Sequence, residues 1–115
     1  DTHHLTPRTS YGTQKAICEL LIDDYSRKGY LDGISVRFPT ISIRPGKPNK
    51  AASSFISGIM REPLSGVEAV CPVTRDVRHP VASPRKAVEY LVTAASVDKD
   101  RLVAGGTRSF TMPGI

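Results

Sequence analysis

Tyr11 and Lys15 are four residues apart in the segment Tyr-Gly-Thr-Gln-Lys. Residues at this spacing share one face of a helix, so the two side chains are expected to lie together. An unperturbed tyrosine has a pKa near 10, and reaching about 7 requires stabilising the phenolate by about 4 kcal/mol. A neighbouring ammonium stabilises the phenolate, and the helix N-terminus adds a smaller effect of the same sign. The pair therefore predicts a general acid/base unit; the alternative is a chance pair on an ordinary helix.

A helix is needed to position this pair, and the apolar pattern predicts one from about Tyr11 to Gly29. Thr9 or Ser10 is placed to cap its start. The helix carries two stripes, one of Ala16, Ile17, Leu20, Leu21 and Tyr25, and one of Tyr11, Lys15, Cys18 and Ile22. Two such stripes indicate a helix that is covered on two sides.

The next element is a predicted strand, because Ile34, Val36 and Phe38 alternate with polar residues up to Pro39. Residues 44–50 contain two prolines and a glycine and are therefore predicted to form an irregular loop.

The remainder of the chain predicts a helix over 51–61 that is broken at Pro63, then a short edge strand over 69–73. Ser83 followed by proline is typical of a helix start, and a last strand is expected over 109–112. Helices and strands in this order predict a mixed α/β fold.

Composition restricts the partners. The 115 residues include 16 Lys and Arg and 11 Asp and Glu, giving a formal net charge of +5 without a cluster of basic residues. An anionic small molecule is therefore favoured over a nucleic acid. The longest apolar runs, such as 20–22, are far short of the roughly 20 residues of a membrane span. His3 and His4 lack further ligands at zinc spacing, so no metal site is predicted.

Two cysteines do not make a disulfide framework, and Cys18 lies within the helical pattern, where a packed thiol is expected. Reduced cysteines predict a cytoplasmic protein. The chain begins without Met and stops after a turn signal, so we interpret it as a fragment.

Three segments carry a resemblance to a known family: 7–16, with its Tyr-x-x-x-Lys pair, 34–41, and 44–53 with its prolines and lysines. They resemble the extended short-chain dehydrogenases/reductases, which include NAD-dependent epimerases and dehydratases. Within that family they are most similar to the dehydrogenases of four-carbon sugar acids such as D-erythronate. The resemblance covers nearly the whole chain, but only the C-terminal part of such an enzyme.

The resemblance implies an α/β fold, the C-terminal part of a Rossmann-type enzyme with its catalytic helix and a small substrate-binding lobe. Residues 1–43 are then the end of the NAD-binding domain, and 44–115 are mainly the substrate lobe with a possible return to the main sheet. The family's glycine-rich fingerprint and its catalytic Ser or Thr have no counterpart here. We therefore expect the 115 residues alone to be inactive and to bind NAD very weakly.

The resemblance also implies roles for individual residues. Tyr11 takes the hydroxyl proton as an alcohol is oxidised, and Lys15 stabilises its phenolate and binds the nicotinamide ribose. Pro39 and Thr40 line the nicotinamide side. Family members commonly pair through the catalytic helix, so a homodimer is expected.

A sugar-acid substrate needs a cation for its carboxylate, and Arg44 and Lys50 stand on the loop after the cofactor-facing strand. A solvated basic loop is the equally weighted alternative. Another polar group is formed by Arg75, Arg78 and His79, for which surface placement is the favoured interpretation.

The predicted reaction is oxidation of a 2-hydroxy sugar acid to the 2-oxo acid with NAD. One alternative is a nucleotide-sugar epimerase or dehydratase that uses the same Tyr11 and Lys15. The loop over 44–50 lacks an aromatic residue that could stack on a base, which argues mildly against it. The other alternative is a non-catalytic α/β binding module.

Overall fold

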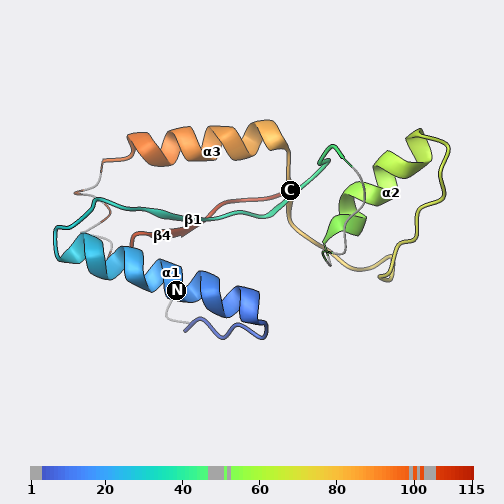
Figure 1. The fold of residues 1–115 in the computed structure, drawn as a ribbon. Helices are drawn as coiled ribbons and strands as arrows, with labels where there is room; N and C mark the ends of the chain where they lie inside the picture. The colour runs from blue at the N-terminus through green and yellow to red at the C-terminus, as the bar shows by residue number, and fades with distance from the viewer. Residues whose placement is uncertain (1–3, 47–50, 52, 99, 101, 103–105) are drawn as a thin grey trace. The chain divides into compact units, whose positions relative to one another are not determined.

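The computed structural model describes residues 4–46, 51, 53–98, 100, 102 and 106–115. The described elements follow in the order α1 (Ser10–Arg27), β1 (Ser35–Arg37), β2 (Thr40–Ile41), α2 (Ser54–Leu64), β3 (Val81–Ala82), α3 (Pro84–Ser96) and β4 (Ser109–Thr111) (Figure 1). The predicted mixed α/β class is confirmed.

The chain forms two compact units. Unit 1 consists of Asp1–Arg37 and Ala94–Phe110, and unit 2 consists of Phe38–Thr93 and Thr111–Ile115. Each unit is described by itself below. The predicted division at 43/44 concerns the domains of a longer enzyme and stays a prediction.

Helix α1 of unit 1 lies within one or two residues of the predicted bounds, since it begins at Ser10 and ends at Arg27. The Thr9 side chain accepts a hydrogen bond from the Gly12 backbone N–H at 3.0 Å, which satisfies a donor in the first turn. Lys28 is the C-cap residue of α1. Gly29 follows with φ of 77°, a left-handed conformation that glycine adopts without strain.

Strand β1 runs alongside α1 in unit 1 and pairs with β4 (Figure 1). The Ser35 N–H donates to the Arg108 carbonyl oxygen at 2.8 Å. The turn between α1 and β1 is fixed by the Gly33 N–H, which donates to Ser26 Oγ at 3.1 Å. A Cβ at Gly33 would stand 2.7 Å from Ile22, so only glycine fits where this turn crosses the helix.

Strands β2 and β3 of unit 2 form a parallel pair, with Thr40 opposite Val81 and Ile41 opposite Ala82. Helix α3 starts as predicted, since Ser83 Oγ accepts from the Lys86 N–H at 3.1 Å. Parallel pairing of these two segments places the loop after β2 and the start of α3 at the same end of the pair.

Several predicted elements differ from the observed ones. Helix α2 begins at Ser54 rather than at 51 and continues through Pro63 to Leu64. Proline is tolerated there because its missing N–H removes only one hydrogen bond of the last turn. The strand predicted over 69–73 is absent; Pro72 removes a donor, and the segment is irregular. Strands β2 and β3, two residues each, were too short for any alternating pattern to reveal.

Few apolar side chains of the described residues are buried, and these are Ile56 and Ala82, each 8% exposed. The apolar stripe of α1 is largely exposed, with Ile17 at 51% and Leu20 at 65%. The packed thiol predicted at Cys18 is wrong, because that side chain is exposed. No described helix is long and apolar enough to cross a membrane.

Candidate active site

Tyr11 and Lys15 lie together at the start of α1, as their spacing predicts. The Lys15 ammonium stands 5.5 Å from the centroid of the Tyr11 ring, within the range of a cation–π contact. The Tyr11 side chain is 69% exposed, and Lys15 is exposed as well. Among the described residues, none accepts a hydrogen bond from the Lys15 ammonium, so its donors are available to a ligand.

The first turn of α1 explains the glycine between the two residues. A Cβ at Gly12 would stand 3.0 Å from Pro7 Cβ and 3.2 Å from Thr9 Oγ1. Thr9 also accepts at its carbonyl oxygen from the Thr13 N–H at 2.9 Å. The close approach at Gly12 is therefore made by Pro7 and Thr9, which precede the helix in the sequence and pack against its first turn.

An ion pair ties the same face of α1 to β1. Arg37 Nε donates to both Glu19 carboxylate oxygens, at 2.8 and 3.0 Å, and Arg37 Nη2 donates to Oε2 at 2.5 Å. The Glu19 side chain is 16% exposed and that of Arg37 38%. Hydrogen bonding to Glu19, together with the nearby charges of Glu19 and Asp23, raises the pKa of Arg37 further above its usual value. The guanidinium is thus held charged beside an acidic helix face.

Pro39 and Thr40, predicted beside the cofactor, belong to unit 2. The Thr40 N–H donates to the Pro80 carbonyl oxygen at 3.1 Å as part of the β2–β3 pairing. Its hydroxyl lies 2.6 Å from His79 Nε2, within hydrogen-bonding distance. His79 is exposed, in agreement with the surface placement favoured from the sequence, yet it fixes the hydroxyl of a predicted site residue.

Arg44 of unit 2 is held through its main chain. Its N–H donates to Ser57 Oγ at 3.1 Å, and its carbonyl oxygen accepts from Arg61 Nη1 at 2.7 Å. Ser57 is 2% exposed, so this support is buried within unit 2. The guanidinium of Arg44 itself forms no hydrogen bond or ion pair with any described residue. Lys50, the second predicted substrate cation, lies outside the described residues.

The predicted site residues are therefore divided between the two units: Tyr11 and Lys15 in unit 1, and Pro39, Thr40 and Arg44 in unit 2. The structure brings Tyr11 and Lys15 together, whereas Pro39 and Thr40 are neighbours in the sequence itself.

Sequence reasoning missed four supporting residues: Glu19, Arg37, Ser57 and Arg61. The position of Glu19, one further four-residue step after Lys15, was a readable signal. The roles of Ser57 and Arg61 depend on how α2 folds against the loop before it, which no local pattern reveals.

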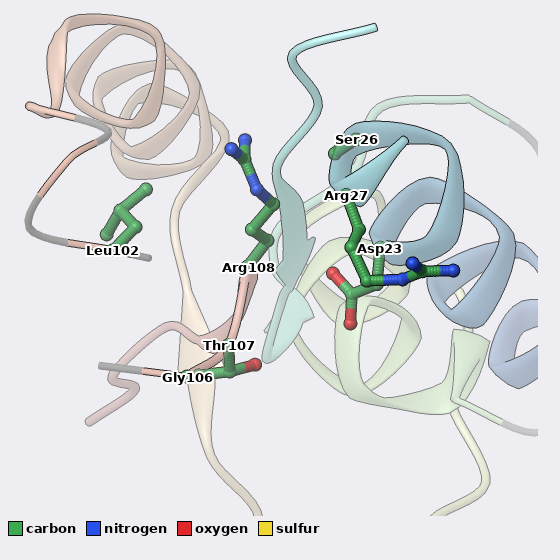
Figure 2. A pocket seen from close by; sticks show the side chains of 7 residues that line it. All are labelled: Asp23, Ser26, Arg27, Leu102, Gly106, Thr107 and Arg108. Atoms are coloured by element: carbon green, nitrogen blue, oxygen red, sulfur yellow. The ribbon is translucent and has the colours of Figure 1, made fainter. Parts of the chain in front are cut away.

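The pocket of unit 1 drawn in Figure 2 is not lined by Tyr11 or Lys15. Figure 2 shows a pocket of unit 1 with a volume of about 400 Å³, lined by Asp23, Ser26, Arg27, Leu102, Gly106, Thr107 and Arg108. Asp23 follows Tyr11 by twelve residues, about 18 Å along the helix. Arg108 in this pocket is bound to Asp32 at 2.7 Å and to the Gly33 carbonyl oxygen at 3.2 Å, so it braces the turn before β1. The described residues contain no cluster of three potential metal ligands.

The fold identifies the class of protein. Over 99% of the chain it matches the crystal structure of a nucleoside-diphosphate-sugar epimerase from Agrobacterium tumefaciens, with a TM-score of 0.88 and 60% sequence identity. The chain corresponds to 33% of that structure. The fold is thus part of a Rossmann-type epimerase or dehydrogenase, as predicted.

Among curated proteins, the chain is 63% identical over 94 residues to a D-erythronate dehydrogenase from Haemophilus influenzae. It is 55% identical over all 115 residues to a D-erythronate dehydrogenase from Cupriavidus necator. These matches confirm the family resemblance: the chain is homologous to part of these dehydrogenases. It spans about a third of their length, 30% and 35% respectively. No family model matches the chain.

Proposed function

We propose that this chain is part of an NAD-dependent dehydrogenase that oxidises D-erythronate, or a similar 2-hydroxy sugar acid, to the 2-oxo acid. The observation that carries the proposal is the exposed Tyr11–Lys15 pair, with 5.5 Å between ammonium and ring centroid, at a capped helix start. The names of the two homologous dehydrogenases support the substrate class.

In the proposed reaction, Tyr11 accepts the proton of the substrate hydroxyl. The hydrogen on the carbon that bears this hydroxyl leaves as hydride. Lys15 stabilises the phenolate by its positive charge and donates hydrogen bonds to the nicotinamide ribose. When bound, NAD would accept the hydride, so a hydride from the carbon and a proton from the hydroxyl leave the alcohol and a carbonyl remains.

The residues present fit one end of this cofactor. An exposed ammonium whose donors are not used within the described structure suits the hydroxyls of a ribose. Pro39 and Thr40 are proposed to line the nicotinamide, with the Thr40 hydroxyl oriented by His79. The sequence offers no glycine-rich loop for a pyrophosphate, so this chain accounts only for the nicotinamide side.

Arg44 is proposed to bind the substrate carboxylate, with Lys50 as a second cation. The support for Arg44 is its fixed main chain combined with a guanidinium that has no partner among the residues described. A guanidinium presented in this way can grip a carboxylate through two parallel hydrogen bonds.

The test is Tyr11→Phe in the full-length protein, assayed for NADH formation from D-erythronate. Removing the general base is expected to lower kcat by about 10²–10⁴-fold while the protein stays folded. Tyr25→Phe, which removes a hydroxyl from an exposed tyrosine of the same helix, is the control and should retain activity. Full activity in Tyr11→Phe would rule out the proposal and favour a non-catalytic binding module.

The second candidate is a nucleotide-sugar epimerase, favoured by the name of the structural neighbour. It uses the same pair, so Tyr11→Phe does not separate the two. The two candidates are separated by supplying the full-length protein with NAD and either D-erythronate or a nucleotide-sugar. If the protein is the dehydrogenase, NADH accumulates with D-erythronate; if it is the epimerase, no net NADH forms with D-erythronate.

We also propose that the protein is cytoplasmic and forms a homodimer through α1. The exposed apolar stripe of α1, with Leu20 at 65% and Leu21 at 51%, supports burial against another surface. Light scattering of the full-length protein, with Leu20→Glu as the disrupting variant, tests the oligomeric state.

A further inference from the structure

The Glu19–Arg37 ion pair has a particular place relative to the proposed catalytic pair. At about 100° per residue, Tyr11 and Glu19 lie about 40° to either side of Lys15 around the axis of α1, and Asp23 lies about 80° away. These four residues form one stripe, and the strand residue that contacts it is Arg37. The face of α1 that carries the proposed chemistry is therefore the face that β1 holds.

The geometry of the Glu19–Arg37 contact restricts the rotation of α1 about its axis relative to β1. Three hydrogen bonds between one guanidinium and one carboxylate fix both groups in a single plane, which a lone point contact does not do. The two residues are 18 positions apart in sequence, so the contact joins elements rather than neighbouring turns. A rotation of α1 that broke it would also turn Lys15, one helical turn away.

Charge gives the contact a second consequence. Without Arg37, the Glu19 carboxylate would stand one turn from Lys15 and compete for its ammonium, as charged residues at this helical spacing do. Asp23 adds a second acidic group on the same stripe, and its Oδ1 is buried without a hydrogen-bond partner among the described residues. Arg37 is hydrogen-bonded to Glu19 and is close enough to Asp23 for the charge of that carboxylate to contribute to the raised pKa of Arg37.

We propose that Glu19 and Arg37 are positioning residues for the proposed catalytic pair: they set the rotation of α1 against β1 and keep Lys15 free to serve Tyr11. This inference rests on the proposed function. In this role both residues act through Lys15 rather than by binding substrate or cofactor.

The experiment measures kcat, KM and the acid limb of the pH–rate profile in the full-length protein. In Arg37→Gln, the freed Glu19 should draw the Lys15 ammonium away from the phenol, moving the limb up by about 0.5–1 pH unit. In Glu19→Gln, the unneutralised Arg37 should move the limb down by a similar amount. Both variants should lower kcat about 5–50-fold with little change in KM, because the catalytic pair is misplaced.

Two further variants separate charge from geometry. Glu19→Gln combined with Arg37→Gln removes both charges, so its limb should return to the wild-type position while kcat stays low. Arg37→Lys keeps the charge but loses the planar fork, so it should also retain the wild-type limb with reduced kcat. These variants guard against the outcome that a single substitution leaves an unpaired charge and does not fold.

Asp24→Asn is the matched control, since Asp24 is an ion-paired carboxylate of α1 that lies about 180° from Lys15. It should change neither the limb nor kcat. Shifts of the same sign in Arg37→Gln and Glu19→Gln, or unchanged kcat in both, would overturn the positioning role. Retained activity in Tyr11→Phe would instead remove the proposed function itself, so the two failures are distinguishable.

Discussion

Unit 1 and unit 2 hold their candidate functional residues by different means. In unit 1, the helix that carries Tyr11 and Lys15 is joined to β1 by the charged side chains of Glu19 and Arg37. In unit 2, Arg44 is held by its own main-chain N–H and carbonyl oxygen. The first arrangement orients one face of α1. The second fixes the main chain of Arg44, whose guanidinium forms no hydrogen bond or ion pair with the described residues.

The difference has a physical consequence for what each unit offers a ligand. Exposed ion pairs weaken with salt and with protonation, whereas a partly buried pair such as Glu19–Arg37 is screened less by salt and still depends on the charge of its carboxylate. A hydrogen bond between a buried hydroxyl and a backbone N–H is insensitive to both. We therefore expect activity to respond to conditions mainly through the proposed catalytic pair and substrate affinity mainly through contacts of Arg44 itself.

The largest effect expected in unit 2 is that of Arg44→Gln in the full-length protein. Losing a charge-assisted contact worth about 1.5–3 kcal/mol should raise KM for D-erythronate about 10–100-fold, with kcat within a few-fold of wild type. The control, Arg85→Gln, removes an exposed arginine from the first turn of α3 and should leave KM unchanged. A lower kcat at constant KM would show that Arg44 does not bind the carboxylate.

The comparison also shows how far sequence alone reached. The helix carrying Tyr11 was predicted to within one or two residues at each end, because its apolar spacing, a capping hydroxyl at its start and the glycine after its end are all local signals. The contact between Tyr11 and Lys15 followed from helix geometry. These features depend on residues within a few turns of one another.

The rest depends on contacts distant in sequence. Strands β2 and β3 pair across about 40 residues, and nothing within either dipeptide indicates it. The same holds for Ser57, a buried serine whose partner is the Arg44 backbone thirteen residues away. Cys18 was misjudged because an apolar stripe predicts burial, whereas its side chain is exposed in the structure.

A smaller effect is expected from Ser57→Ala, which tests the main-chain support of Arg44. The substitution leaves the Arg44 N–H without its acceptor in a partly buried position, which should lower the free energy of unfolding by about 1–2 kcal/mol. The loosened loop should raise KM only about 2–5-fold, because the guanidinium remains. Ser65→Ala is the control: its hydroxyl donates to a carbonyl oxygen at an exposed position, so urea denaturation should be nearly unchanged. Equal destabilisation in both variants would remove the distinction drawn for unit 2.

The smallest effect is expected at Asp24, whose contacts in unit 1 are fully at the surface. Hydrogen bonds from Lys28 and then Arg27 lower the pKa of Asp24 below its usual value of 3.8. A carboxyl with a lowered pKa contributes stability above its unfolded-state pKa and loses it as pH falls through the folded-state value. Asp24→Asn should therefore shift the urea midpoint slightly at pH 7, and the difference from wild type should shrink progressively as the pH falls below 3.8.

Salt provides the discriminating condition for this last prediction. Because Asp24 is exposed to solvent, about 1 M NaCl should abolish the difference at pH 7, with screening over about 3 Å. The Glu19–Arg37 contact is partly buried, at 16% and 38% exposure, and its variants should keep most of their kcat effect in the same salt. The contrary result would be that about 1 M NaCl abolishes the kcat difference between Arg37→Gln and wild type, as it should abolish the Asp24→Asn difference in urea midpoint. The Glu19–Arg37 contact would then be an ordinary surface ion pair that does not set the rotation of α1.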